Sequence, residues 1–437
     1  MRRFLLLLLI LSPLMSAHAD TKIAMRVLRD ECLGCHKPGK AKGGLLLTTR
    51  EKMLLGGDNG TSVIPGKVAE SPLYQLVLEE ADPHMPPKKQ ISKAQIAALD
   101  AWIKAGAPWD ASVFDELPKA APVALTPLPA TYQPVLALAI SPDEKRLAIA
   151  AGSRVHLHDL SKPENPRIGS LSGHDEAVQS VVWTQDGKML ITGGFRQIRL
   201  WDATTLQSTG QISTAFVGNL TALALTADQR TLFVADGEAG GAGFIHRMDL
   251  VEKKVLATWK AHDDNIYALK LSPDGKALAS AAADKLARLW NVADGKLISS
   301  YEGHTNHVLS VAFNKDATQL ATAGADREIK VWDVKSREQD VTLGDKKTAF
   351  TALAWTPDGK ALVAVTEKGG GSIYTELKKH DGAQRSDTAK QAKLASAGGM
   401  LYSVAVTGDA KRVFAGGDDG KVWLWDGAGK QTGSIAP

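Results

Sequence analysis

The sequence predicts a multidomain protein in which a small all-α domain is followed by an all-β, seven-bladed propeller. Two observations carry this prediction. Apolar residues in the N-terminal part repeat with the period of a helix, and from residue 134 onward a turn built on aspartate recurs between alternating apolar runs. Helix patterns followed by evenly spaced strand patterns are typical of separate domains. A chain of 437 residues is also longer than one ordinary domain.

The composition excludes several classes of protein. Hydrophobic residues make up 44% of the chain and charged residues 23%, as in a soluble globular protein. The formal net charge is +4 and no long basic run occurs, so nothing favours nucleic acid as a partner. The 2 cysteines are too few for a disulfide scaffold. No apolar stretch is long enough for an integral membrane segment.

The first element, residues 1–19, has the three parts of a cleavable signal peptide. Arg2 and Arg3 give a positive start, an apolar run follows, and Ala17 and Ala19 supply small residues before the expected cleavage point. An apolar run of about twelve residues is too short to span a membrane. We therefore expect export to the periplasm.

The second element, residues 20–112, carries the chemistry. Cys32, Cys35 and His36 form a Cys-x-x-Cys-His run, which is the attachment signal of c-type haem. Two thiols three positions apart on one helical turn can add to the two vinyl groups on one edge of a porphyrin. The histidine that follows then points at the iron from the proximal side. The run predicts one covalent haem c, attached through Cys32 and Cys35, with His36 as proximal ligand.

The distal iron ligand must come from elsewhere in this domain. Met85 is the first candidate, because a thioether favours electron transfer and because Pro86 and Pro87 would stiffen its loop. His84 is the runner-up, since its side chain is only one residue away. Met53 is a more remote candidate, and packing in the core is the simpler expectation for it.

Other roles of a Cys-x-x-Cys run fit this sequence less well. A thioredoxin-like dithiol would need a surrounding βαβ pattern, which is absent. A zinc site would need two further Cys or His ligands, and only His84 is left in this domain. A structural disulfide would not need His36.

The pattern around the motif predicts short helices. Ser71 and Pro72 are expected as an N-cap and a first-turn proline, and Ser92 with Gln95 forms a capping box before a helix that stops at Gly106. A domain of roughly 90 residues is short of core, and a buried porphyrin would supply the missing apolar volume.

From residue 32 to residue 109 the sequence resembles a planctomycete-type cytochrome c domain. The resemblance rests on seven runs: CLGCH at 32–36, KGGL at 42–45, GGD at 56–58, VIPG at 63–66, SPL at 71–73, MPP at 85–87 and WIKAGAPW at 102–109. It implies covalent haem through Cys32 and Cys35, with His36 proximal and Met85 distal. The GGD run offers no ligand, and a turn is expected there.

Residues 113–133 are rich in proline and alanine and are expected to form a semi-rigid linker. A propeller is predicted for residues 134–437, because strand–turn–strand patterns repeat there with a period of about 43 residues. The turns carry Asp143, Asp186, Asp228, Asp274, Asp316, Asp358 and Asp409. The last strand of the ring could come from residues 430–436 or from the linker.

These repeats resemble WD40 repeats. The family's structural hydrogen-bond set matches in the fourth and fifth repeats, which contain His262, Ser280, Asp284 and Trp290, and His304, Thr322, Asp326 and Trp332. The second repeat keeps His174, Thr192 and Trp201 but has Phe195 where an aspartate is expected. The first, third and sixth repeats lack the tryptophan. The resemblance implies a seven-bladed propeller.

The propeller offers no recognisable catalytic site. His156 and His158 alternate along one expected strand and so share a face, but a metal pair is not favoured without a third ligand. No Ser-His-Asp arrangement and no Gly-rich phosphate loop can be recognised, so no catalytic residue is predicted.

Two functions are compatible with this organisation. In the first, an exported c-type cytochrome transfers single electrons, and the propeller docks a redox partner or scaffolds another protein. A six-coordinate iron with no open site suits this role. In the second, the chain is a haem-containing binding or sensor protein whose propeller recognises a partner or ligand. A haem enzyme such as a peroxidase is disfavoured because Met85 would fill the open position. We expect an electron carrier rather than an enzyme.

Overall fold

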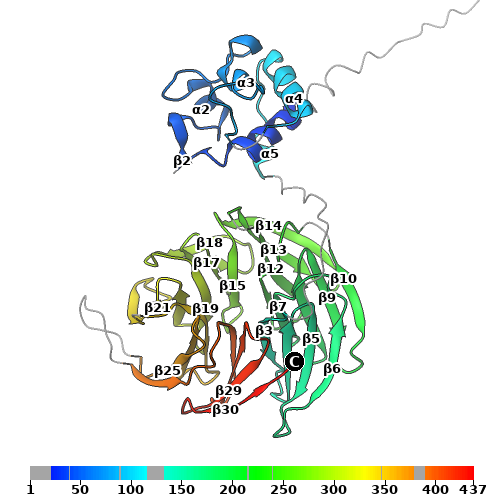
Figure 1. Ribbon diagram of the computed structural model, residues 1–437, viewed down its shortest axis with the longest axis vertical. Coiled ribbons are helices and arrows are strands. Elements are labelled where there is room, and N and C mark those ends of the chain that lie inside the picture. Colours follow the sequence, from blue (N-terminus) through cyan, green and yellow to red (C-terminus); the bar gives the residue numbers. More distant parts are fainter. Residues whose placement is uncertain are drawn as a thin grey trace, which may run out of the picture. The chain divides into compact units, whose positions relative to one another are not determined.

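The computed structural model describes residues 21–38, 40–87, 90–115, 132–213, 216–238, 240–345, 347–377 and 389–437. The chain divides into two compact units, Met1–Pro118 and Lys119–Pro437 (Figure 1). The expected signal peptide and most of the expected linker lie outside the described residues. Among the residues that the structure describes, no helix is long and apolar enough to cross a membrane.

Short helices make up most of the first unit. Residues 21–27 are helical. The helical elements that follow are η1 (Leu28–Cys32), η2 (Lys42–Gly44), α2 (Arg50–Leu55), η3 (Val68–Glu70), α3 (Pro72–Gln75), α4 (Lys93–Lys104) and α5 (Ser112–Asp115). One antiparallel pair, β1 (His36–Lys37) with β2 (Lys40–Ala41), lies between η1 and η2. The expectation of an all-α domain is therefore met only in outline, because the chain reverses direction directly after Cys35.

Helix α4 forms for the reasons that the sequence indicates. The Ser92 hydroxyl accepts a hydrogen bond from the Gln95 amide, and the Gln95 side chain accepts one from the Ser92 amide, which confirms the capping box. The helix buries Leu99, Trp102 and Ile103 completely. It ends before Gly106, whose φ of 91° lies in the left-handed region that glycine tolerates.

The start of α3 differs from the expectation. Pro72 occupies the first turn, as predicted, and Ser71 precedes it. The Ser71 side chain does not cap this helix, however. Its hydroxyl accepts from the Ile64 amide and donates to the Lys67 carbonyl oxygen, at 2.9 and 2.8 Å. Ser71 thus ties the preceding loop together, and this role depends on a turn of chain that the local pattern does not reveal.

The second unit consists of seven four-stranded antiparallel sheets, and this confirms the predicted seven-bladed propeller. The first four blades are β3 (Val135–Ile140), β4 (Arg146–Ala151), β5 (Arg154–Asp159) and β6 (Arg167–Ser172); β7 (Ser180–Trp183), β8 (Met189–Gly194), β9 (Gln197–Asp202) and β10 (Ser208–Ile212); β11 (Ala222–Leu225), β12 (Thr231–Gly237), β13 (Gly243–Asp249) and β14 (Lys254–His262); and β15 (Ile266–Leu271), β16 (Ala277–Ala282), β17 (Ala287–Asn291) and β18 (Leu297–Tyr301).

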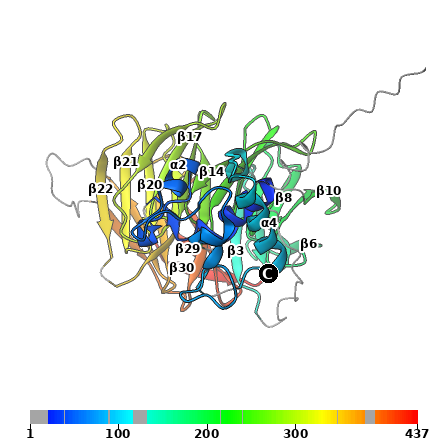
Figure 2. The same cartoon turned by 90° about the horizontal axis from the view of Figure 1, so that it is seen from above.

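The last three blades follow the same order. They are β19 (Val308–Phe313), β20 (Gln319–Gly324), β21 (Glu328–Asp333) and β22 (Gln339–Gly344); β23 (Phe350–Trp355), β24 (Ala361–Thr366), β25 (Gly371–Thr375) and β26 (Lys390–Leu394); and β27 (Leu401–Val406), β28 (Arg412–Gly417), β29 (Val422–Asp426) and β30 (Gln431–Ile435). Figure 2 shows β20, β21 and β22 side by side within one blade. Each blade is therefore built from consecutive strands.

The recurring aspartate has a local structural role. In the first blade the Ser141 hydroxyl donates to the Asp143 carboxylate at 2.5 Å, and this carboxylate accepts from the Lys145 amide at 3.2 Å. Hydroxyl–aspartate pairs repeat this contact at Asp186, Asp228, Asp274, Asp358 and Asp409. Such side chains satisfy turn amides that the ladder leaves unpaired, which explains the period in the sequence.

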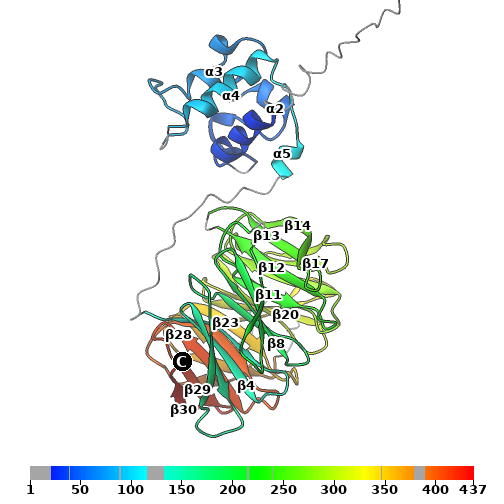
Figure 3. The ribbon, with the colours of Figure 1, turned by 90° about the vertical axis from the view of Figure 1, so that its right-hand side faces the viewer.

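The ring closes between the last blade and the first. The outer strand of the last blade is β30, so of the two expected sources the C-terminal residues supply it. In two views, β29 and β30 lie beside strands of the first blade (Figure 1, Figure 3). The Arg412 guanidinium donates to the Leu160 carbonyl oxygen at 3.1 Å, and the Gly408 amide donates to the Glu144 carboxylate at 2.5 Å. Buried apolar residues join the two blades: Val135, Leu147, Ile149, Phe414, Val422, Leu424 and Ile435.

Candidate functional site

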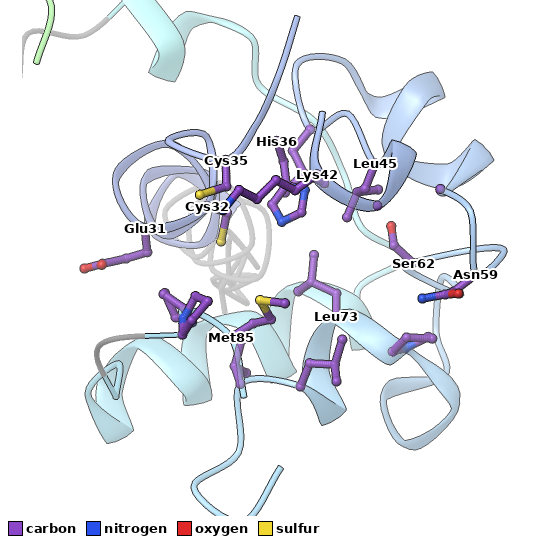
Figure 4. Close-up of a pocket in the computed structure, with 18 of the residues that line it drawn as sticks. Glu31, Cys32, Cys35, His36, Lys42, Leu45, Asn59, Ser62, Leu73 and Met85 are labelled. Atoms are coloured by element: carbon purple, nitrogen blue, oxygen red, sulfur yellow. The ribbon is translucent and has the colours of Figure 1, made fainter. Parts of the chain in front are cut away.

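The first unit contains a cavity lined mainly by apolar side chains. Its volume is about 250 Å3, compared with the roughly 10–15 Å3 that a cavity needs to hold one water molecule. Three of the predicted residues line one wall, and Met85 lines the opposite wall (Figure 4). The main lining residues are Cys32, Cys35, His36, Lys42, Leu45, Leu47, Pro72, Leu73, Leu76, Val77, Met85, Pro86 and Pro87.

The chain after η1 places the three residues of the motif in this wall. The Cys35 amide donates to the Cys32 carbonyl oxygen at 3.1 Å, which closes a tight turn. Two longer-range bonds hold the segment that follows: the Lys42 amide donates to Cys35, and the Leu47 amide donates to His36. Figure 4 shows Cys32, Cys35 and His36 gathered on one side of the cavity.

The imidazole of His36 is the least satisfied group in this wall. Its Nδ1 atom is buried and has no hydrogen-bond partner among the described residues. Buried polar atoms are nearly always paired, so an orphaned ring nitrogen at a cavity needs an explanation. Neutral imidazole is a common metal ligand through either ring nitrogen. This observation is consistent with a ligand role for His36.

On the opposite wall the structure distinguishes Met85 from His84. The Met85 amide donates to the Leu76 carbonyl oxygen at 2.7 Å, and the Met85 thioether faces the cavity (Figure 4). The His84 ring does not line the cavity. Its Nδ1 lies 3.0 Å from the Pro86 carbonyl oxygen, and its Nε2 lies 2.6 Å from the Gln90 side-chain oxygen. The geometry favours Met85.

Met53 lies in the core. It is completely buried and belongs to the apolar cluster of the first unit, not to the lining of the cavity. The expectation that Met53 packs in the core is confirmed.

The electrostatics around Cys32 disfavour a reactive dithiol. Burial, together with the negative charge of Glu31 and the neighbouring Cys35, raises the pKa of the Cys32 thiol to about 12. Nucleophilic and zinc-binding cysteines need the thiolate, which a positive environment promotes. Among the described residues, no group of three or more His, Cys, Asp or Glu could hold a metal ion.

The residues present fit a covalently bound porphyrin. The structure brings together two thiols, an imidazole and, across an apolar cavity, a thioether. Thiols can form thioethers, while imidazole and thioether are the axial ligands of haem in electron-transfer cytochromes. The apolar lining could exclude water from such a group.

The GGD run, for which the sequence suggested only a turn, shapes the cavity wall. A Cβ atom on Gly57 would lie 2.2 Å from the Gly43 carbonyl oxygen, and one on Gly44 would lie 2.3 Å from an Asp58 carboxylate oxygen. The Asp58 amide donates to the Gly43 carbonyl oxygen at 2.8 Å. The two glycine runs therefore allow two backbone segments to meet at the cavity. Sequence reasoning missed this role because the runs pair only in three dimensions.

In the propeller, the expected hydrogen-bond sets are formed. In the fourth blade, His262 Nε2 lies 2.7 Å from the Ser280 hydroxyl, Trp290 Nε1 donates to that hydroxyl at 2.8 Å, and His262 Nδ1 lies 3.0 Å from Asp284. Burial alone would raise the pKa of the Asp284 carboxyl group. The hydrogen bond and the charge of His262 outweigh burial and lower this pKa to about 2.

The fifth and second blades follow this pattern to different extents. In the fifth blade the same hydrogen bonds are formed by His304, Thr322, Asp326 and Trp332. The second keeps only the bonds of His174 and Trp201 to Thr192.

Two other histidine groups have structural partners. His156 Nδ1 lies 2.8 Å from the Ser170 hydroxyl, and His158 Nδ1 lies 2.8 Å from the Asn165 carbonyl oxygen. Burial, with nearby Arg167, lowers the pKa of His156 to about 4. A metal pair remains disfavoured.

The third blade contains a group that the sequence did not reveal. His246 Nε2 lies 3.0 Å from Asp236, and His246 Nδ1 lies 2.8 Å from the Thr258 hydroxyl. The Asp236 carboxylate also accepts from the amides of Val217 and Gly218. Both His246 and Asp236 side chains are fully buried, so the group stabilises the blade instead of forming an open site. No local sequence signal could have predicted this group, since the third repeat has no histidine at the position that the other sets use.

Comparison with protein families agrees with this division. Residues 32–89 match the family described as Planctomycete cytochrome C. Residues 165–202, 253–291, 295–333 and 391–426 match the WD domain, G-beta repeat. A region that matches the Planctomycete cytochrome C family is thus joined to a seven-bladed propeller whose repeats match the WD domain.

Several curated proteins are similar to part of this chain. The chain is 28% identical over 243 residues to the serine-threonine kinase receptor-associated protein of Gallus gallus, which covers 47% of this chain and 65% of the relative. It is 26% identical over 244 residues to the Homo sapiens protein of the same name, with the same coverage. It is 28% identical over 146 residues to "Cell division cycle 20.5, cofactor of APC complex" of Arabidopsis thaliana, covering 33% of this chain and 31% of the relative. Each match covers less than two thirds of the relative.

Proposed function

We propose that this protein is an exported c-type cytochrome that carries one covalent haem for single-electron transfer and uses its propeller as a docking or scaffold module. The observation that carries the proposal is the convergence of Cys32, Cys35, His36 and Met85 on one apolar cavity.

The haem, when bound, supplies an iron that gains and loses one electron. The residues of this chain do the rest. Cys32 and Cys35 would hold the group through thioether bonds. His36 and Met85 would bind the iron from opposite sides, which leaves no open position for a substrate. The electron carrier would therefore have no substrate turnover of its own.

The leader indicates the compartment in which the haem would act, and the propeller indicates the kind of partner. Residues 1–19 support export to the periplasm, where haem is attached to such motifs. The propeller supports binding to a protein, because this fold presents large, rigid surfaces. The names of the relatives agree with such a role: one is a receptor-associated protein and another a cofactor of the APC complex. The partner would be a redox protein or a protein docked beside one.

The proposal can be tested on the full chain produced with haem maturation in the periplasm. We expect a pigment that stays attached after denaturation, and a low-spin, six-coordinate spectrum that carbon monoxide does not change. The double variant Cys32→Ala, Cys35→Ala should lose the covalent pigment and keep the propeller, as judged by its circular dichroism. Covalent pigment in that variant would contradict the assignment of the attachment site. Ready carbon monoxide binding by the wild type would instead favour the haem sensor.

A further inference from the structure

The last blade contains a second pocket that the cytochrome function does not use. It is formed by the loop between β26 and β27 and by the turn between β28 and β29. Its lining consists of Ala397, Gly398, Gly399, Asp418, Asp419, Lys421 and Trp423. The loop contributes no side chain larger than a methyl group. A Cβ atom on Gly399 would lie 2.1 Å from an Asp418 carboxylate oxygen, so glycine is required for this approach.

The strand register shows what this pocket replaces. In the last blade Ala415 pairs with Trp423, as Ser280 pairs with Arg288 in the fourth blade. Asp419 therefore stands in the place of Asp284.

The histidine of the set is missing from the last blade. In the fourth and fifth blades it lies four residues before the inner strand begins, and in the last blade this position is Ala397. The pocket opens where the fourth and fifth blades hold an imidazole ring.

Loss of that ring leaves the carboxylate with fewer donors. Asp284 accepts from the His262 ring, from the Asp263 amide at 3.1 Å and from the Arg288 guanidinium at 2.9 Å. Among the described residues, Asp419 accepts only from the Lys421 amide at 3.0 Å and from Trp423 Nε1 at 3.1 Å. The Asp419 side chain is exposed, so its remaining acceptor positions face the pocket and solvent.

We propose that this pocket binds the guanidinium group of an arginine side chain from a partner protein. The inference rests on the proposed docking role of the propeller and specifies the chemistry of the partner. Two carboxylates, Asp418 and Asp419, give the pocket the opposite charge, and the Trp423 ring supplies an aromatic wall. The same protein already contains a guanidinium–carboxylate contact in another blade, where one nitrogen of Arg288 donates to Asp284 at 2.9 Å.

The other cationic side chains fit this site less well. An imidazole would leave one ring nitrogen without a partner, because Ala415 replaces the hydroxyl that the histidines of other blades contact. A lysine ammonium cannot form the flat, two-pronged contact with carboxylates or stack on a ring as a guanidinium does. The Lys421 ammonium lies 5.6 Å from the centre of the Trp423 ring and is exposed, so it must move aside and will weaken binding.

The test is a calorimetric titration of the full chain with the peptide acetyl-Gly-Arg-Gly-amide, with the lysine and alanine peptides of the same length as comparisons. We expect the arginine peptide to bind at least tenfold more tightly than the other two. Asp419→Asn keeps the shape of the side chain and removes its charge, and it should weaken binding at least tenfold. Equal binding of the arginine and lysine peptides, or binding by Asp419→Asn within twofold of the wild type, would overturn the proposal.

A second variant guards against misfolding. Ala397→His places an imidazole where the fourth and fifth blades hold theirs, so it should fill the pocket and abolish peptide binding. Circular dichroism and a cooperative thermal transition check that the variant is folded. A stably folded Ala397→His protein that still binds the arginine peptide like the wild type would refute the assignment of the site.

Failure of this inference can be told apart from failure of the proposed function. Peptide binding needs no haem, so the Cys32→Ala, Cys35→Ala variant should bind the arginine peptide like the wild type. A partner that is retained by both the wild type and Asp419→Asn would support docking by the propeller and contradict the role of this pocket. Loss of one partner in Asp419→Asn, while the spectrum of the haem is unchanged, supports the pocket.

Discussion

Substitution of His174 in the second blade isolates the effect of a buried histidine that has no carboxylate partner. His174 keeps the hydrogen bond to Thr192 at 2.7 Å, and the side chain is 8% exposed. Burial, followed by the positive charge of Arg199, lowers the pKa of the His174 ring from 6.5 to about 4. The folded protein thus holds this ring neutral at pH values where the unfolded chain protonates it.

The sign and size of the effect follow from this difference in pKa. Between pH 6.5 and pH 4 the unfolded state binds a proton at His174 that the folded state does not bind, so the free energy of unfolding falls as the pH falls. A change from 6.5 to about 4 corresponds to about 3 kcal/mol. His174→Gln removes this contribution. At pH 7 the variant should be less stable by about 1–3 kcal/mol, because Thr192 loses its partner and a small cavity opens.

The assay is urea unfolding of the full chain, followed by tryptophan fluorescence at pH 7, 5.5 and 4. The difference in unfolding free energy between wild type and His174→Gln should narrow by about 3 kcal/mol from pH 7 to pH 4. Thr192→Val is the control, because it removes the hydrogen bond of His174, together with that of Trp201, and keeps the imidazole ring. The stability gap between wild type and Thr192→Val should therefore not narrow in this way. A gap for His174→Gln that is constant across the three pH values would refute the reasoning.

Three further outcomes are expected. Met85→Ala should lower the reduction potential of the haem protein and allow the reduced form to bind carbon monoxide, whereas Met53→Leu should do neither. If the spectra and the potential of Met85→Ala are unchanged, Met85 is not the iron ligand. Thr322→Val should destabilise the propeller by about 1–3 kcal/mol in urea unfolding, because two buried ring nitrogens lose their partner, while the exposed Thr305→Val should change stability by less than about 0.5 kcal/mol. Ser92→Ala should cost the first unit about 1 kcal/mol in thermal unfolding, since it breaks the capping box; an unchanged transition would contradict that role.

The polar sets of the blades show how one repeat diverges into different roles. The fourth and fifth blades keep histidine, hydroxyl, aspartate and tryptophan, and their polar atoms satisfy one another. The second blade lacks the carboxylate and holds a neutral histidine. The last blade lacks the histidine and hydroxyl, so Asp419 is left available to a ligand. Each loss removes a partner from a buried network, and the consequence depends on whether the remaining group is buried or exposed.

Much of the fold could be predicted because its signals lie close together in the sequence. The turn aspartates act on amides two residues away, and the capping box joins Ser92 to Gln95. These contacts are local, so their spacing is visible without a structure. The source of the closing strand was not visible in this way. It depends on contacts such as that between Arg412 and Leu160, which are far apart in the chain.

The candidate site shows the same boundary between local and long-range information. The sequence by itself determined that two thiols and an imidazole share one turn, that a methionine precedes two prolines, and that seven repeats follow, because each depends on residue type and short spacing. Only the tertiary structure decided that Met85 and not His84 faces the cavity. His84 is held away by the Gln90 side chain, which in turn donates to the Val77 carbonyl oxygen. The direction of a side chain in a loop is set by the residues that pack against it in the folded protein. The spacing of residues in the local sequence does not identify these partners.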